Sequence, residues 1–559
     1  MKKRIRMGTS IILAALLAMS IPSCAPSGGT GGTQDSSSEE PLQTGQKELS
    51  DTSLPFADGD VTLSLLTFDS WYAPASYADS LPVWEEMEKR TGVKIEFQVV
   101  PYADSEAVIQ TRLASGSNLP DITAVPPWTT TAGVTQYAQE DVLLCLDPYL
   151  ENGAMPSTEA FLKEYPNIAA QMQSTDGSYY AVANVIALVN PVIPRAIIVR
   201  DDWLKKAGFE NVEDLVTVED WETYLRAVRD GDYNGNGKAD EIPLITENVG
   251  QLLSFSSGFG FDVAPDDQSN FFYYDEDGTV SFALADDRMK DCVAWLRDLY
   301  AEGLIYNQLE NNSETIWSLY LQDIVGAHCK VAVDYITRAD GLLAGIDDNA
   351  LHLMTTTPSE SKENLCKMQM RPDVEFRFAI TTACQNPDIA AKWVDYVWAS
   401  KDGNILKDFG IKGLSYDEAD DGTLYYTDYI LKNDQNLSAH DMMRTLGGAP
   451  SFLVLDSLES WEQKQKGTSV WSEGERLSDR LTSPFPMMVL TMEENETILN
   501  LLPDFQTYYL EMITKFITGT ESMDQWDAYV ENLRALGLEE ITAVYQAEMD
   551  RYLEFVNGE

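Results

Sequence analysis

Apolar and polar positions alternate in two short segments near the start of the long folded region. Residues 61–65 carry an apolar side chain at every second position, and residues 93–99 repeat that pattern. A period of two predicts strands. The intervening residues 81–90 have helical spacing and are followed closely by Gly92, a residue type that ends helices readily. The pattern therefore predicts a strand, a helix and a second strand in succession.

This alternation of strand and helix continues and then gives way to helices near the carboxyl end. A helix over 105–114 leads to a short apolar strand over 122–125, which predicts an α/β lobe with a mainly parallel sheet covered by helices. Residues 526–533 and 541–552 place apolar and aromatic side chains at helical spacing. We expect those aromatic side chains to pack in the core.

The amino terminus has the pattern of a secretory signal. Four cationic residues precede the apolar run 11–21, which is too short for an ordinary membrane span. We expect a signal peptide over residues 1–23. The run ends in Ile21-Pro22-Ser23-Cys24, which resembles the lipobox of bacterial lipoproteins, so lipidation is predicted at Cys24. The alternative is cleavage by the ordinary secretory peptidase, with Cys24 an incidental thiol.

A long polar segment follows this cysteine. Residues 24–57 are mostly Gly, Ser, Thr, Gln and acidic residues, a composition that buries too little apolar surface to fold. We interpret the segment as a disordered tether. About 500 residues remain after Asp58, which is long enough for two domains.

The charge balance narrows the range of partners. The chain has 39 Lys and Arg against 90 Asp and Glu, a formal net charge of −51. Repulsion by phosphate excludes nucleic acid as a partner. A polyanionic ligand would be repelled as well, unless cations line its site. A neutral sugar is therefore favoured over a strongly acidic one.

Several sequence blocks resemble a known family. Residues 113–116 with 119–122 are similar to family 1 extracellular solute-binding proteins, of the maltose-binding-protein superfamily. Residues 198–208, 387–413 and 526–537 resemble the large LipO-type lipoproteins of Gram-positive bacteria and the alginate-oligosaccharide-binding proteins. The similarity covers nearly all of the chain after the tether.

This resemblance implies a two-lobe α/β fold of the periplasmic-binding-protein type (type II), with a ligand cleft between lobes joined by hinge segments. We expect an amino-terminal lobe of residues 58–190 plus 345–410 and a carboxyl-terminal lobe of 191–344 plus 411–559. Strand polarity places the site at the carboxyl ends of the strands, facing the cleft.

The resemblance also implies a function. The chain is expected to be the extracellular, lipid-anchored solute-binding component of an ABC importer, a monomer that captures an oligosaccharide by hinge closure and delivers it to the permease subunits. Its only contact with the membrane would be the lipid anchor. The alternatives are a ligand-sensing lipoprotein that docks a membrane receptor or kinase, and a secreted glycoside hydrolase.

One local motif has the spacing of a calcium loop. Oxygen-bearing side chains occupy positions one, three, five and nine from Asp232, and Gly237 stands at position six. Position twelve is Pro243, so we expect Glu241 to close the site, as the alginate-binding relatives imply. The alternative is an ordinary turn with solvated acids. The candidate ligands of this structural Ca²⁺ are Asp232, Asn234, Asn236, Lys238 (through its carbonyl oxygen), Asp240 and Glu241.

Sugar recognition needs flat apolar faces together with groups that hydrogen-bond to hydroxyls. The best candidates follow predicted strands, where loops should reach the cleft. They are Trp71, Tyr72, Trp128 and Tyr335, with Trp317 and Arg371 as weaker candidates. For each aromatic residue the alternative is packing in the core.

Enzyme motifs are missing from the sequence. The three histidines, His328, His352 and His440, are far apart in the chain, and neither a Gly-x-Ser-x-Gly elbow nor a phosphate loop occurs. We therefore predict no catalytic residue. A glycoside hydrolase stays open, because its two carboxylates need only spatial proximity.

Overall fold

The structure is a computed structural model of the 559-residue chain, and it describes residues 49–557 apart from short internal gaps. The gaps are 70–73, 127–130, 187–193, 266, 276, 333–334, 344–345, 347–350, 372, 436, 451, 454, 456, 466–467, 484 and 486–489. Cys24 and most of the predicted tether lie outside the described residues. Its end, residues 49–57, is described, and Phe56 and Ala57 pack against the buried residues of the fold, so the disordered segment was predicted too long.

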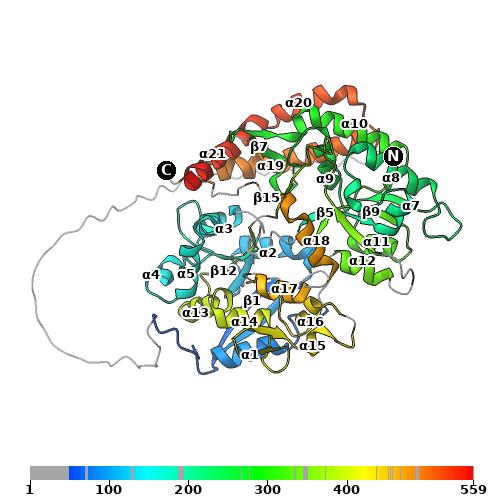
Figure 1. Ribbon diagram of the computed structural model, residues 1–559. Coiled ribbons are helices and arrows are strands. Elements are labelled where there is room, and N and C mark those ends of the chain that lie inside the picture. Colours follow the sequence, from blue (N-terminus) through cyan, green and yellow to red (C-terminus); the bar gives the residue numbers. More distant parts are fainter. Residues whose placement is uncertain are drawn as a thin grey trace, which may run out of the picture. The chain divides into compact units, whose positions relative to one another are not determined.

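A five-stranded mixed sheet forms the first part of the fold, in the order β2-β1-β3-β12-β4. Two of its strands, β1 and β12, are labelled in Figure 1, near helices α13 and α14. Strand β1 pairs in parallel with β2 and β3, whereas β12 is antiparallel to both β3 and β4. The strands are β1 Val61–Phe68, β2 Val93–Val100, β3 Ile122–Val125, β4 Val182–Val185 and β12 Val374–Ile380. The strands predicted over 61–65, 93–99 and 122–125 are confirmed.

The first helix ends where the sequence predicts. Helix α1, Pro82–Thr91, begins with proline at its first position and is capped by Gly92 in the left-handed conformation at φ 70°. A Cβ at Gly92 would stand 1.7 Å from the carbonyl oxygen of Ala57, so only glycine fits there. Helix α2, Ser105–Ser115, follows the second strand as expected.

The first hydrophobic core contains the inward faces of this sheet and helices from two distant stretches of chain. The early helices are α3 Ala132–Gln139, α4 Asp147–Glu151, α5 Pro156–Glu164 and α6 Pro166–Met172. The later elements are α13 Pro387–Trp398, α14 Lys401–Asp408, β13 Tyr416–Glu418, β14 Leu424–Tyr426, α15 Asp428–Leu431 and α16 Ala439–Thr445. Buried residues as far as Leu455 belong to this core.

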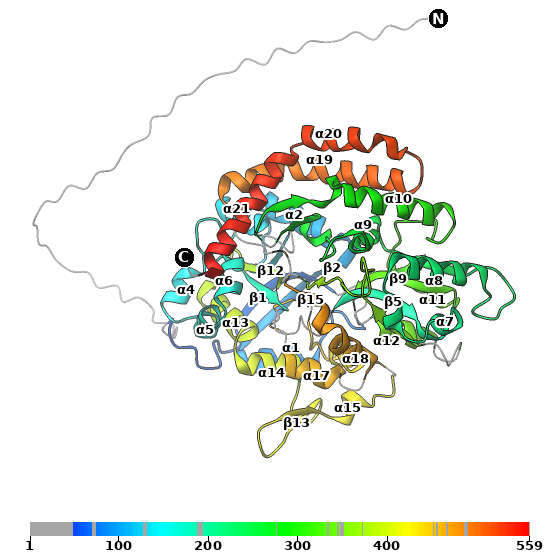
Figure 2. The same cartoon turned by 45° about the horizontal axis from the view of Figure 1, so that its top comes forward.

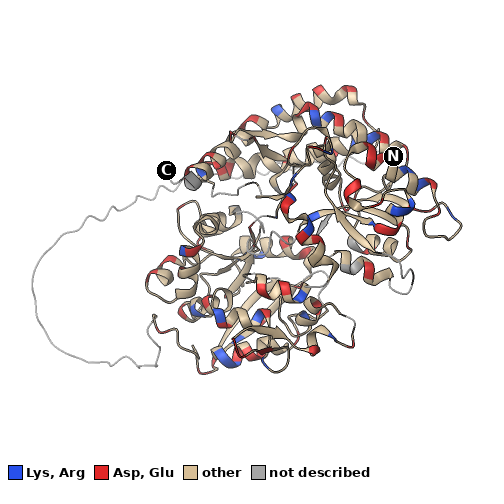
Figure 3. Cartoon of the chain, in the orientation of Figure 1, with Lys and Arg blue, Asp and Glu red and all other residues tan. Residues whose placement is uncertain are grey.

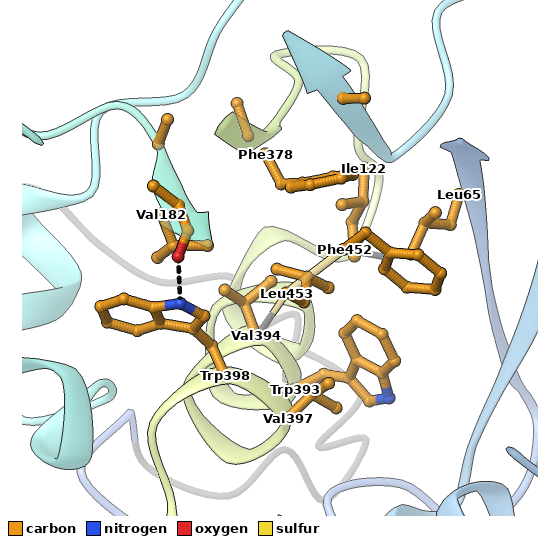
Figure 4. Close-up of a cluster of buried hydrophobic side chains, with 14 of the residues drawn as sticks. Leu65, Ile122, Val182, Phe378, Trp393, Val394, Val397, Trp398, Phe452 and Leu453 are labelled. Carbon is orange, nitrogen blue, oxygen red and sulfur yellow. Dashed lines mark hydrogen bonds between the residues drawn. The ribbon is translucent and has the colours of Figure 1, made fainter. Parts of the chain in front are cut away.

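Large aromatic side chains fill the centre of the first core. Trp393 and Trp398 of α13 are fully buried, and Phe452 stacks on Trp84 at a centroid distance of 5.5 Å. The indole nitrogen of Trp398 donates to the carbonyl oxygen of Ala183 at 2.6 Å (Figure 4). This bond fixes α13 against strand β4, because a buried indole N–H needs an acceptor.

A second, four-stranded sheet has the order β10-β5-β9-β6. Strands β6 and β9 are parallel, and β5 is antiparallel to both of its neighbours. The bounds are β5 Arg195–Arg200, β6 Ile242–Ile245, β9 Val325–Ala332 and β10 His352–Thr355. Its helices are α7 Asp201–Lys206, α8 Val218–Asp230, α9 Val249–Leu252, α11 Ser313–Tyr320 and α12 Tyr335–Leu343.

Long helices of the carboxyl end complete the second core. Helices α10, α19, α20 and α21 gather beside one another, together with the β7–β8 hairpin (Figure 2). Their bounds are α10 Asp287–Ala301, α19 Met492–Ile517, α20 Trp526–Ala535 and α21 Leu538–Asn557, with β7 Phe272–Tyr274 and β8 Val280–Phe282. Trp526 and Tyr529 are buried, which confirms the expected packing of the carboxyl-terminal aromatics.

A small third cluster of buried residues is built where the chain passes between the two cores. The chain makes three such passages, between Val185 and Ile197, between Met354 and Val374, and between Leu455 and Phe485. All three supply side chains to the cluster, which contains Ile186, Ala196, Ile198, Ile336, Met354, Met368, Val470 and Leu477. The last two passages also pair through β11 Met368–Gln369 and β15 Leu481–Thr482, and the third includes α17 Leu458–Gln465 and α18 Ser469–Leu477.

Candidate functional site

The polarity of the strands gives each sheet one edge where a ligand site is expected. In the first sheet the parallel strands end near Phe68 and Val100, and the antiparallel β12 starts at the same edge. In the second sheet, β6 and β9 end near Ile245 and Ala332, and Arg195 starts β5 there. We call these the first and the second carboxyl edge. Open α/β sheets bind ligands at such edges.

Tyr335 stands at the second carboxyl edge and is held there by a carboxylate. Its hydroxyl donates to Oε1 of Glu247 at 2.8 Å, and Oε2 of Glu247 accepts from the Gln251 side chain at 2.9 Å. The Tyr335 ring is partly exposed and lies 5.0 Å from the ring of Trp317. The candidate is thus fixed in place with part of its surface open, although its contact with a ligand stays a prediction.

Trp317 is more enclosed than Tyr335. It is 6% exposed and packs between Tyr335 and Tyr320. This burial favours the core-packing alternative, because a ligand-stacking ring must present a face to solvent. Its role in binding stays a prediction.

Two histidines that are distant in the sequence come together on the buried Tyr320 ring. His328 and His352 lie on Tyr320 at centroid distances of 5.9 and 5.6 Å. Burial lowers the pKa of His328 to about 4. Burial also lowers the pKa of His352, although the Asp340 carboxylate, 2.7 Å from its Nδ1, opposes the shift. Both imidazoles are therefore neutral at pH 7. The His328 ring lies 5.8 Å from that of Tyr335, so an uncharged ring packs against this candidate.

The first carboxyl edge carries an exposed aromatic residue that sequence reasoning missed. Tyr102 follows β2, is 42% exposed, and rests on Phe68 at a centroid distance of 5.7 Å. Burial of part of the side chain raises the pKa of Tyr102; the Glu375 carboxylate adds to the rise and Arg371 opposes it. Its place directly after a predicted strand is the signal that selected Trp71 and Trp128, and it could have found Tyr102 too.

Arg371 lies beside Tyr102 in an ion pair. Its Nε and Nη2 atoms donate to the two carboxylate oxygens of Glu375 at 3.1 and 2.7 Å. Arg371 is partly exposed, whereas Glu375 is 7% exposed. The geometry is bidentate, which orients the guanidinium. The contact of Arg371 with a ligand stays a prediction, and Trp71, Tyr72 and Trp128 lie outside the described residues.

The predicted calcium loop connects α8 to β6 and folds around its own side-chain oxygens. Asp232 accepts from the amide of Gly237 at 2.9 Å, Asn234 from the amide of Asn236 at 3.0 Å, and Asn236 from the amide of Lys238 at 2.8 Å. The Asn236 side-chain amide also donates to Asp240 at 3.0 Å. The loop therefore has the tight turn that its glycines allow.

Glu241 closes this loop and leaves one oxygen in need of a partner. Its Oε1 accepts from the backbone amide of Tyr233 at 2.7 Å, whereas its Oε2 is buried without a hydrogen-bond partner. A buried carboxylate oxygen requires a donor or a cation, so the donor set fits Ca²⁺. The described part of the chain contains no cluster of three Asp, Glu, His or Cys side chains arranged for a metal. The calcium site therefore stays a prediction.

The loop is attached to the second sheet. The Asn234 side chain donates to the carbonyl oxygen of Asp323 at 3.0 Å, and the Asp323 carboxylate pairs with Arg200. Arg200 is fully buried in β5 and also pairs with Asp202 at 2.8 Å. Because a buried guanidinium needs these two carboxylates, the loop end and the strand are held together.

None of the helices in the described ranges has the length and hydropathy needed to cross a membrane.

Comparison with known sequences gives one family and two relatives. The family described as bacterial extracellular solute-binding protein matches residues 71–403. The fructooligosaccharide ABC transporter substrate-binding protein FusA of Streptococcus pneumoniae is 24% identical over 519 residues, 88% of this chain and 90% of FusA. Lipoprotein LipO of Bacillus subtilis is 24% identical over 284 residues, 49% of this chain and 51% of LipO.

Solved structures share the fold. The alginate-binding protein AlgQ2, solved without calcium ion, superposes with a TM-score of 0.73 at 22% identity, covering 90% of this chain and all of AlgQ2. FusA in complex with kestose gives a TM-score of 0.72 at 19% identity, covering 88% of this chain and 99% of FusA. A FusA EF-hand mutant with fructo-nystose gives 0.70 at 19% identity, with the same coverage. The two-lobe α/β fold is thereby confirmed.

Proposed function

Because the chain belongs to the bacterial extracellular solute-binding protein family, we propose that it is the solute-capturing component of an ABC importer for an oligosaccharide. The observation that carries this proposal is its similarity to FusA, which extends over 88% of this chain and 90% of FusA. The fold shared with FusA and AlgQ2 supports it. Because the similarity spans both lobes, it supports the function of the whole protein and not of one lobe alone.

Capture proceeds by closure of two lobes around the solute, with the two carboxyl edges as the binding surfaces. Aromatic faces such as Tyr335 stack on the sugar, and polar groups replace its water shell. Closure is driven only by the higher affinity of the closed form for the ligand. No bond is made or broken, so the protein is not an enzyme.

The buried cores support a revised division of the chain between the lobes. We assign 58–185 and 374–455 to the first lobe, and 197–354 and 485–557 to the second. Relative to the expectation from sequence, residues 411–455 move to the first lobe, since Tyr416 to Leu455 pack in the first core. Strand β10 joins the second lobe because it pairs with β5. The segments in between are the hinge.

Lipidation of Cys24 and a flexible tether would keep the captured solute near its permease on the extracellular face of the cell membrane. The resemblance of the amino terminus to a lipobox and the similarity to LipO support this part of the proposal. The protein acts as a monomer, tethered by its acyl chains.

The 232–241 loop would hold a structural Ca²⁺. Side-chain oxygens of Asp232, Asn234, Asn236, Asp240 and Glu241 and the carbonyl oxygen of Lys238 would supply the ligands. When bound, the ion would supply positive charge to the Glu241 oxygen that has no hydrogen-bond partner. The existence of an EF-hand mutant of FusA and of a calcium-free AlgQ2 structure supports the proposal.

Thermal shift measurements on the mature chain, with calcium present, test the function. A panel of neutral and uronic oligosaccharides is used, and a ligand at a hundredfold excess over its Kd adds about 2.7 kcal/mol to the stability of the folded state. We expect one glycan class to raise the unfolding midpoint reproducibly and to be recovered chemically intact. A panel without any shift contradicts the carbohydrate assignment, and a cleaved glycan contradicts the absence of catalysis.

A further inference from the structure

The charges around Tyr102 carry information about the ligand. Glu375, Arg371 and Glu106 all act electrostatically on this side chain, and two of the three are carboxylates. The one cation, Arg371, is joined to Glu375 by two hydrogen bonds. Two of these three groups are thus carboxylates that would repel an anion approaching the exposed Tyr102 ring. Figure 3 shows acidic residues spread widely over the ribbon, in agreement with the net charge of −51.

The geometry of the Arg371–Glu375 pair matters as much as its net charge. Arginine binds a carboxylate most tightly when two parallel N–H groups meet its two oxygens. The Nε and Nη2 side of Arg371 makes that arrangement with Glu375. An incoming sugar carboxylate would have to replace a buried protein carboxylate to use the same side.

The second carboxyl edge also has carboxylates beside its polar side chains. Glu247 receives hydrogen bonds from neutral partners, the Tyr335 hydroxyl and the Gln251 amide. Arg195, at the start of β5, has the Asp267 carboxylate 3.9 Å away. Both arginines that we place at the two edges thus have a carboxylate of the same protein beside them.

We propose that the site selects uncharged oligosaccharides against uronic acid units, and that Glu375 sets this selectivity by matching the charge of Arg371. The inference rests on the proposed capture of an oligosaccharide. A neutral sugar can stack on Tyr102 and exchange hydroxyl hydrogen bonds with the ion pair. A uronate would lose its hydration and meet the Glu375 and Glu106 carboxylates, while Arg371 is already bound to Glu375. Repulsion and desolvation of this kind are a usual means of rejecting a charged ligand.

Isothermal titration calorimetry on the full mature chain tests the proposal. The neutral probes are kestose, nystose, and malto-, manno- and xylo-oligosaccharides, and the uronic probes are alginate and pectate oligosaccharides of equal length. We expect one neutral class to bind at least about 100-fold more tightly than any uronic probe. In Glu375→Gln, which keeps the shape but removes the charge, we expect this preference to narrow about tenfold, mainly through tighter uronate binding.

A matched control is available in the β13–β14 hairpin. Lys412, just before β13, and Glu418, on β13, form an exposed ion pair at 2.6 Å. Like Glu375→Gln, Glu418→Gln removes the carboxylate of an ion pair. It should leave the preference for neutral over uronic probes unchanged. If Glu375→Gln does not fold, as judged by circular dichroism, Arg371→Gln replaces it. Loss of that cation should preserve the rejection of uronates.

Each outcome separates the inference from the proposed function. Tighter binding of a uronic than of a neutral probe by the unmodified chain overturns the inference and leaves the importer proposal standing. If Glu375→Gln prefers neutral over uronic probes as strongly as the unmodified chain does, Glu375 does not set the selectivity. Uronate binding that is lost in Arg371→Gln would contradict the role of Glu375 as well. If no saccharide binds, the proposed function fails and the inference fails with it.

Discussion

Tyr102 and Tyr335 stand at the carboxyl edges of different sheets, and their surroundings differ. Tyr102 is 42% exposed and rests on Phe68 beside an ion pair. Tyr335 is partly enclosed, its hydroxyl is bound to Glu247, and neutral imidazole lies beneath it. The first edge thus offers an adaptable surface and the second a fixed one. A pre-oriented ring loses less entropy on binding, so we expect Tyr335 to contribute more to affinity than Tyr102.

The largest effect is expected from removal of the fixed ring. Tyr335→Ala should weaken oligosaccharide binding about 100-fold, as enclosed aromatic contacts commonly do when truncated. Tyr335→Phe keeps the ring, loses the bond to Glu247 and should cost only about tenfold. Calorimetry with the ligand found by thermal shift measures both variants. A Tyr335→Ala protein that is folded and binds normally would show that this ring is structural only.

Chelation of calcium should come next, and it acts on the second edge through β6. Removing the ion with a chelator should lower the unfolding midpoint by a few degrees, equivalent to about 2.7 kcal/mol if calcium is at a hundredfold excess over its Kd. Glu241→Gln should show little response to the chelator, whereas Asp230→Asn, just outside the loop, should respond like the unmodified chain. Equal responses from all three proteins would argue against the loop as the site.

Acidification should weaken the support under Tyr335. The unfolded chain has a histidine pKa of about 6.5, whereas burial lowers the pKa of His328 to about 4 in the folded chain. The unfolded state therefore binds a proton first as the pH falls. Stability is fully present above about pH 6.5 and declines by up to about 1.4 kcal/mol per pH unit down to about pH 4 for this one group.

Denaturant unfolding at several pH values measures this slope. The buried His352 and the partly buried His440 also have pKa values lowered by desolvation, so they contribute with the same sign. His328→Gln should reduce the dependence of the free energy of unfolding on pH by the contribution of one histidine. A variant with the slope of the unmodified chain would mean that His328 is protonated in the folded protein.

The smallest effect belongs to the exposed ring. Tyr102→Ala should weaken binding about fivefold and change the free energy of unfolding by less than about 0.5 kcal/mol. Tyr425→Ala, which removes a ring that is 46% exposed on the β13–β14 hairpin, should leave binding unchanged. If Tyr102→Ala weakens binding as much as Tyr335→Ala, the two edges contribute equally and the contrast between them disappears.

Local pattern predicted much of this structure. The alternation in residues 61–65 and 93–99, and Gly92 after a helical segment, identified β1, α1 and β2, because these features depend on neighbours in sequence. The oxygen spacing from Asp232 likewise located a loop whose side chains do turn inward on its own backbone.

Contacts between distant residues could not be predicted in the same way. His328 and His352 looked scattered, yet β9 and β10 lie on either side of β5 and bring both rings onto Tyr320. The placement of residues 416–455 in the first core depends on burial against Trp84 and Trp393. Trp84 is several hundred positions away in the sequence, so no local pattern could predict this contact. Tyr102 is different, since it follows a predicted strand just as Trp128 does, and the same local signal could have found it.

The small cluster formed by the three passages bears on cooperativity. Its side chains, such as Ile186, Met354 and Val470, come from separate stretches of chain, and each stretch is anchored in a large core on either side. Melting one lobe would strip these residues of their neighbours and expose apolar surface to water. The joint between the lobes therefore couples their unfolding, and a calorimetric scan of the folded region should give one heat-absorption peak.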